Sequence, residues 1–197
     1  DSYAALAGFI QAIREAGCKT LIIHARKAYL QGLSPKQNRT VPPLKYDYAY
    51  RIKARYPDLE IVVNGGITSL DAAADHLEHV DGVMLGRCAY HDPWVLAGVD
   101  ARFFGGRQPT ATRSDIVQRM LPYISRELQT GTQLKHITRH MLGLFQGMPG
   151  ARHWRRHLSE QAIRADAGTD VVVDALQKVA GSRQADTTAT GYHQQHG

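Results

Sequence analysis

The first half of the chain alternates two hydrophobic patterns. Apolar residues recur every three or four positions, as in amphipathic helices, over residues 3–16, 46–56 and 69–78. Between these segments stand continuous apolar runs of strand length, at 19–24, 61–63 and 82–85. Alternation of helix and strand predicts a parallel α/β sheet, and the unbroken apolar runs predict strands that are buried on both faces.

The pattern changes in the second half. From Thr112 onward no run of strand type recurs, and helical periodicity fills most of the sequence. Helices are predicted at 114–128, 134–146, 152–165 and 171–180, after one last helix of the α/β part at 93–104. This half therefore predicts an all-α helical bundle. The sequence from Ser182 lacks apolar periodicity and predicts a disordered tail.

The predicted strands end in residues that suit an anion. These residues are His24, Asn64, Gly65, Gly66, Gly86 and Arg87. Glycine lets the backbone approach a phosphate and exposes amide N–H donors, and arginine adds a permanent positive charge. A strand-end histidine alone is more often structural, but beside two glycine motifs it is interpreted as a phosphate ligand. The carboxyl ends of parallel strands share one edge, so a site for a phosphorylated cofactor is predicted there.

These features predict the C-terminal part of a (β/α)₈ TIM barrel. A complete barrel has eight strands in about 250 residues, so in this chain of 197 residues we expect the first five strands to precede Asp1. A three-stranded domain complete in itself is the alternative, but it would leave two parallel edges exposed. The expected division is the last three barrel strands in 1–106, a helical domain in 107–181 and the tail in 182–197.

The formal net charge of +6 is distributed unevenly. Residues 107–164 hold 10 Lys/Arg against 3 Asp/Glu, whereas residues 1–106 hold 12 against 11. A basic helical part predicts a polyanionic partner, and a merely solvated basic face is the alternative. The long loop 25–44 in the α/β part is also basic and contains no acid. Within it, Lys36 and Arg39 suit contacts to phosphodiester groups.

A second basic cluster follows the turn at Gly150. Arg152, Arg155 and Arg156 are spaced i, i+3 and i+4, so they share one face of the predicted helix. Cations near a helix N-terminus oppose the helix dipole, which disfavours a stabilising role and favours anion binding.

Several other kinds of chemistry are not indicated. Cys18 and Cys88 are the two cysteines and form no CxxC motif, so neither a disulfide framework nor a zinc site is predicted. Histidine pairs spaced i, i+4 lack an acidic third ligand, which disfavours any metal site. Without a signal peptide or an apolar run of spanning length, we expect a cytoplasmic protein with no membrane partner. No general acid, base or nucleophile stands out.

Specific motifs give the sequence a family resemblance. From about Asp1 to Ala180 it resembles the A subfamily of bacterial tRNA-dihydrouridine synthases. The matching stretches are His24-Ala25-Arg26-Lys27-Ala28, Gly32-Leu33-Ser34-Pro35-Lys36, Asn38-Arg39, Pro42-Pro43-Leu44, Asn64-Gly65-Gly66-Ile67, Asp81-Gly82-Val83-Met84, His136 to Gly147, Pro149-Gly150-Ala151-Arg152 and Trp154-Arg155-Arg156.

The resemblance implies an FMN-binding (β/α)₈ barrel followed by a helical tRNA-binding domain. In this family FMN reduced by NADPH passes hydride to a uridine flipped out of the tRNA, and a cysteine donates the proton. The FMN ligands implied, mainly to the phosphate, are His24, Asn64, Gly65, Gly66, Gly86 and Arg87. The tRNA contacts implied are Lys36, Arg39, Arg152 and Arg155.

The resemblance also implies what is missing. The family's catalytic cysteine lies in the first half of the barrel, and neither Cys18 nor Cys88 takes its place. We therefore expect no catalytic residue in this chain, which should be inactive by itself. We also expect the protein to be monomeric. Two alternatives stay open: a non-catalytic RNA-binding module attached to a barrel fragment, and a different FMN or sugar-phosphate barrel enzyme.

Overall fold

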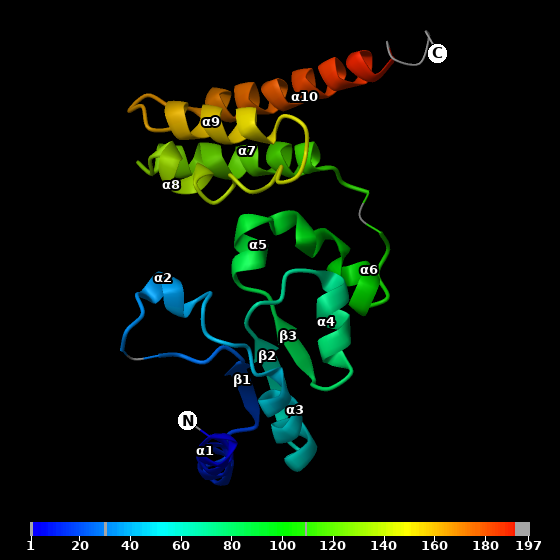
Figure 1. Ribbon diagram of the computed structural model, residues 1–197. Helices are drawn as coiled ribbons and strands as arrows, with labels where there is room; N and C mark the ends of the chain where they lie inside the picture. The colour runs from blue at the N-terminus through cyan, green and yellow to red at the C-terminus, as the bar shows by residue number, and fades with distance from the viewer. Residues whose placement is uncertain (1, 30, 109, 192–197) are drawn as a thin grey trace. The chain divides into compact units, whose positions relative to one another are not determined.

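The computed structural model describes residues 2–29, 31–108 and 110–191, with side chains described as far as Gly181. The chain divides into two compact units, Asp1–Cys88 and Ala89–Gly197, each with its own core (Figure 1). We call them the sheet unit and the helical unit.

The sheet unit is built on three parallel strands in the order β1-β2-β3. These are β1 (Thr20–His24), β2 (Glu60–Asn64) and β3 (Gly82–Met84). In the register, His24 pairs with Asn64, and Asn64 pairs with Met84. The carboxyl ends of all three strands therefore lie side by side, as the sequence predicts.

Helices pack on one face of this sheet, α3 (Tyr46–Arg55) against β2 and α4 (Leu70–Leu77) against β3. The first helix, α1 (Tyr3–Glu15), contacts α3, where the ring centres of Tyr3 and Tyr48 lie 5.6 Å apart. Helix α4 begins after Ser69, whose Oγ accepts a hydrogen bond from Ala72 N. On the covered face Ile61 and Val63 are 0% exposed. On the other face Ile22 is 55% exposed. The prediction that the strands are buried on both faces is therefore wrong within the described residues, because no described helix packs against that second face.

The helical unit contains four main helices and a shorter connecting segment. The main helices are α7 (Arg113–Gln129), α8 (Leu134–Thr138), α9 (Ala151–Gln161) and α10 (Thr169–Gly191). The connecting segment consists of α5 (Arg87–His91), which begins in the sheet unit, a 3₁₀ helix (η1, Pro93–Gly98) and α6 (Val99–Phe103). No described helix has both the length and the apolar character needed to cross a membrane.

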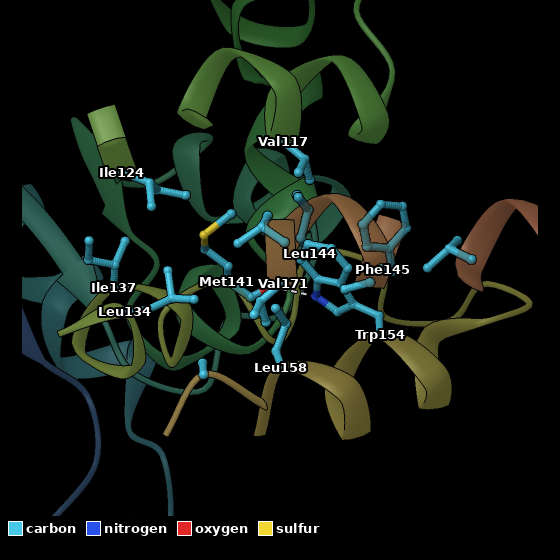
Figure 2. Close-up of a cluster of buried hydrophobic side chains, with 14 of the residues drawn as sticks. Val117, Ile124, Leu134, Ile137, Met141, Leu144, Phe145, Trp154, Leu158 and Val171 are labelled. Carbon is cyan, nitrogen blue, oxygen red and sulfur yellow. Dashed lines mark hydrogen bonds between the residues drawn. The ribbon is translucent and has the colours of Figure 1, made fainter. Parts of the chain in front are cut away.

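A single apolar cluster holds the helical unit together. Figure 2 shows the Trp154 indole directed from α9 into this cluster, beside Leu144 and Phe145. The indole is 0% exposed, and its Nε1 donates a hydrogen bond of 3.0 Å to the Met141 carbonyl oxygen. Trp154 is therefore a core residue of the helical unit.

The segment after α8 differs from its prediction. We expected a helix over 134–146, but α8 ends at Thr138 and a series of turns follows as far as Met148. Within these turns Gly143 comes close to the connecting segment: a Cβ there would lie 2.0 Å from the His91 carbonyl oxygen, an approach that glycine permits. Turn hydrogen bonds, such as Leu144 N to Met141 O (3.1 Å), replace the helical ones.

The division between the units falls between Cys88 and Ala89, earlier than the expected boundary after Gly106. The connecting segment belongs with the helical unit because Trp94 packs against its core and the Arg113 guanidinium lies 4.7 Å from the centre of the Trp94 ring. The backbone of α10 continues to Gly191, past Ser182, where we expected the tail to begin; the remaining tail residues, 192–197, lie outside the described residues.

Candidate functional site

The carboxyl edge of the sheet brings together the residues predicted to hold a phosphate. His24 and Asn64 are register partners at the ends of β1 and β2. The His24 ring lies against the turn that follows, since a Cβ on Gly65 would be 3.0 Å from His24 Cε1. Asn64 also reaches toward β3, where its Nδ2 lies 3.3 Å from Met84 Sδ.

A backbone hydrogen bond fixes the orientation of the His24 imidazole. Its Nδ1 accepts a hydrogen bond of 3.1 Å from the backbone N–H of Arg26. A nitrogen that accepts cannot carry the proton, so neutral His24 carries it on Nε2. The exposed ring can therefore donate one N–H from a fixed position.

The Gly65-Gly66 turn is shaped by side chains that pack around it. Both residues have positive φ, 116° and 74°, which glycine adopts without strain. A Cβ on Gly66 would lie 2.6 Å from Leu44 Cδ1, so a larger residue would collide there. The Tyr46 hydroxyl donates a hydrogen bond of 2.6 Å to the Gly65 carbonyl oxygen, and burial raises the pKa of Tyr46.

The third strand end adds Gly86 and Arg87. The space beside Gly86 is open, with no atom within 4 Å of an added Cβ. Arg87 is exposed, and its Nη2 donates a hydrogen bond of 2.8 Å to the Arg39 carbonyl oxygen. The other N–H groups of the guanidinium take no part in this hydrogen bond. Within the described part of the chain, the amide N–H groups of Gly65, Gly66 and Gly86 make no hydrogen bond. The edge thus offers unpaired backbone donors, one imidazole N–H and one guanidinium.

The long basic loop has defined contacts at its described residues, 25–29 and 31–45, which we call the rim loop. Its two ends pair as an antiparallel bridge between Arg26 and Leu44. Between them lies the short helix α2 (Pro35–Asn38), which begins after Ser34 with a capping box formed with Gln37. Figure 1 shows this loop extending from the end of β1.

The two cations predicted in this loop point into solvent. Lys36 and Arg39 are exposed, and no described residue pairs with either side chain. Because the Arg39 carbonyl accepts from Arg87, the rim loop and the predicted phosphate ligands belong to one connected site.

Two residues of this site were not singled out from the sequence. Arg26 donates from Nη1 to the carbonyl oxygens of Thr40 (3.0 Å) and Pro42, and Tyr46 supports the glycine turn. Arg26 stands inside the His24-Ala25-Arg26 motif, which was the one available signal. Its partners lie 14 and 16 residues away, and no periodicity predicts such contacts.

The predicted basic face of the helical unit lies at the start of α9. Gly150 precedes the helix with φ of 82°, as the sharp turn requires. Arg152 is exposed, and no described residue pairs with its side chain, whereas the half-buried Arg155 donates from Nη1 to Gln146 Oε1 at 3.2 Å. Arg156 instead forms an ion pair of 2.9 Å with Glu160 on its own helix.

The other polar clusters have structural partners. The Cys88 thiol lies 3.2 Å from the Thr68 carbonyl oxygen. His140 contacts the Tyr90 hydroxyl through Nδ1 at 3.1 Å and Arg139 through Nε2 at 3.0 Å. Among the described residues there is no group of three or more potential metal ligands.

The sequence is similar to a known protein family. Residues 1–180 match the family model for dihydrouridine synthase (Dus). The chain is 56% identical over 180 residues to the tRNA-dihydrouridine(20/20a) synthase of Vibrio cholerae, covering 91% of this chain and 55% of that protein. It is 55% identical over 179 residues to the protein of the same name from Shewanella oneidensis, covering 91% and 53%.

A third relative, the tRNA-dihydrouridine(20/20a) synthase of Escherichia coli K12, is 54% identical over 184 residues, which cover 93% of this chain and 53% of that protein. The chain thus spans about half the length of the curated relatives it matches. The match extends through both units, and it confirms the resemblance inferred from the motifs. The chain belongs to the dihydrouridine synthase family.

Proposed function

We propose that this chain forms part of an FMN-dependent tRNA-dihydrouridine synthase. The observation that carries the proposal is the convergence of donors at the carboxyl edge of a sheet whose sequence belongs to this family. The sheet unit is assigned the FMN phosphate and part of the tRNA surface, and the helical unit is assigned the rest of the tRNA contact.

The residues at the edge fit a phosphate. The unpaired amides of Gly65, Gly66 and Gly86 suit its oxygen atoms, because backbone N–H groups form compact anion sites. His24 Nε2–H and the Arg87 guanidinium would add one neutral and one charged donor, and an ionised pair makes the stronger hydrogen bond. Bound there, reduced FMN would supply the hydride that converts a uridine of tRNA to 5,6-dihydrouridine, with NADPH as the reductant.

The chain's own residues are assigned to binding and orientation. Asn64 would fix the flavin near the strand ends, and Lys36 with Arg39 would hold tRNA phosphates beside it. No catalytic role is assigned to Cys88, whose thiol contacts the Thr68 carbonyl, or to Cys18, which lies before β1 at the opposite edge of the sheet.

The open face of the sheet supports the barrel part of the proposal. Ile22 and Met84 lie on this face at 55% and 36% exposure, which is unusual for strand residues of this type. In a closed (β/α)₈ barrel the same face would line the filled interior. We accordingly propose that the three strands belong to a barrel and that the helices of the second unit form a bundle.

Substitution of Arg87 tests the assignment. We expect Arg87→Ala to weaken FMN binding by about 10- to 100-fold, since a charge-assisted hydrogen bond contributes roughly 1.5–3 kcal/mol. FMN affinity would be measured by flavin fluorescence, and dihydrouridine in tRNA by mass spectrometry. Arg14→Ala is the matched control, because Arg14 pairs with Asp58 near the amino ends of the strands. Equal FMN affinity in the Arg87 and Arg14 variants would remove Arg87 from the site.

A further inference from the structure

The rim loop is held in shape by one internal arginine. Arg26 donates from Nη1 to the carbonyl oxygens of Thr40 (3.0 Å) and Pro42. Its backbone is bridged to Leu44, next to a hydrogen bond of 2.8 Å from Lys45 N to Ala25 O. The two ends of the loop are therefore joined by both main chain and side chain.

The carbonyl groups that Arg26 contacts follow shortly after Arg39, whose side chain is an exposed cation. Thr40 directly follows Arg39, whose own carbonyl accepts from Arg87. On the other side, the Asn38 side chain makes two hydrogen bonds of 2.8 Å with the backbone N–H and C=O of Tyr29. Arg39 thus stands in a segment whose backbone is fixed on both sides, while its side chain stays exposed.

Arg26 itself is poorly placed to bind a phosphate. The residue is half-buried, and its Nε is a buried atom with no partner among the described residues. Its Nη1 is already engaged by two carbonyl groups of its own loop. Burial of a charge costs free energy that hydrogen bonds must offset. The hydrogen bonds of Arg26 do this, and they also fix the conformation of the loop.

We infer that Arg26 is the positioning residue of the rim loop, which presents Lys36 and Arg39 to tRNA without touching tRNA itself. The inference rests on the proposed function, because it takes the rim loop to be a tRNA contact. A loop that is ordered before binding does not lose its backbone freedom when the complex forms. Arg26 therefore contributes to affinity through order and not through charge.

This role separates two quantities that a direct phosphate contact would change together. Removing a phosphate contact lowers both the affinity and the slope of log K against log salt, the latter by roughly 0.7–0.9. Loss of a positioning residue lowers the affinity but leaves the slope unchanged, because Lys36 and Arg39 still reach their phosphates in the complex. It also loosens the loop when no tRNA is present.

The experiment compares wild type, Arg26→Ala, Arg26→Lys and the charge-matched control Arg14→Ala. Hydrogen exchange without tRNA would follow the amides of Arg39, Thr40 and Val41, which donate to carbonyl groups of α2. We expect exchange about 10-fold faster or more in Arg26→Ala, by loss of two charge-assisted hydrogen bonds. Arg26→Lys should restore part of the protection, and Arg14→Ala should match wild type.

The tRNA measurements use the same variants across a range of salt concentrations. We expect Arg26→Ala to bind about 10-fold more weakly with an unchanged salt slope. Unchanged exchange in Arg26→Ala, or a slope lower by about one contact, would overturn the inference. If Arg26→Ala does not fold, Arg26→Lys gives the same two readouts, and wild-type exchange and affinity there would overturn it. Failure of wild type to bind tRNA would instead contradict the proposed function, while the exchange result would still decide what Arg26 does to the loop.

Discussion

The two regions proposed to bind anions use different kinds of donor. At the carboxyl edge of the sheet the donors are mainly backbone amides, at Gly65, Gly66 and Gly86, and side chains pack around the first two. In the helical unit they are arginine side chains on the first turns of α9, where Arg152 is exposed.

The two kinds of donor suit different anions. Backbone donors in a packed turn cannot move far, so they suit one small group with a defined shape, such as a phosphate ester. Long exposed cations adapt to the irregular backbone of a large polyanion, and they act through charge that salt screens. Geometry should therefore dominate at the carboxyl edge of the sheet, and electrostatics at the first turns of α9.

The largest expected effect tests whether the two units have independent cores. Trp154→Ala should destabilise the helical unit by about 3–5 kcal/mol, because it removes a buried indole and leaves a cavity. It also leaves the Met141 carbonyl without its hydrogen-bond donor. Chemical denaturation would measure the loss, and FMN affinity should stay near wild type, since the flavin site lies in the sheet unit.

The matched control is Tyr123→Ala, which removes an aromatic ring that is 40% exposed on α7. A surface change of this kind should cost about 0.5 kcal/mol or less. Equal losses in the two variants would contradict the core role of Trp154, and loss of FMN binding in Trp154→Ala would contradict the independence of the two units.

A smaller effect is expected from the exposed arginines. Replacing both Arg152 and Arg155 with Ala should weaken tRNA binding and reduce the salt slope by roughly 0.7–0.9 for each lost contact. Arg164→Ala is the control, because Arg164 is exposed on the same unit but pairs with Asp166 at 2.7 Å. An unchanged affinity and slope in the double variant would mean that this basic face is only solvated.

The smallest effect concerns pH and the packing of α3 on α4. Burial lowers the pKa of His76, a nearby Asp75 opposes this, and the neighbouring His79 adds to it. The ring contacts that of Tyr46 in a tilted arrangement with 4.3 Å between centroids, and its Nδ1 contacts the Tyr50 hydroxyl. Because the folded-state pKa lies below the usual 6.5, the unfolded state takes up protons first as pH falls.

The contribution of His76 to stability is thus complete above pH 6.5 and is lost as pH falls toward the folded-state pKa. Denaturation of the sheet unit between pH 7.5 and 5 should show this decline in wild type and a weaker one in His76→Gln. Identical pH profiles would assign the decline to other groups.

The sequence was sufficient for the features that depend on local patterns. The three strands follow from unbroken apolar runs, and α4 and α7 follow from the helical periodicity that predicts helices over 69–78 and 114–128. The carboxyl edge could also be predicted, because parallel strands must bring His24 and Asn64 to the same side.

The sequence was insufficient where distant contacts decide the conformation. Apolar spacing over 134–146 favoured one helix, but α8 ends at Thr138 and turns follow, in which Gly143 comes close to the His91 carbonyl. The bonds of Arg26 to the carbonyl groups of Thr40 and Pro42 depend on how the whole rim loop folds back. A charged residue in a basic loop looks the same in sequence whether it faces solvent or its own backbone.

The most direct test of the central claim follows the backbone amides that are proposed to hold the phosphate. Flavin-free protein labelled with ¹⁵N would be titrated with FMN and, separately, with riboflavin, which lacks the phosphate. We predict that FMN moves the amide signals of Gly65, Gly66 and Gly86 strongly downfield, as new hydrogen bonds to an anion do, and that riboflavin leaves them nearly unchanged. Binding of FMN with these three signals unmoved would contradict the account.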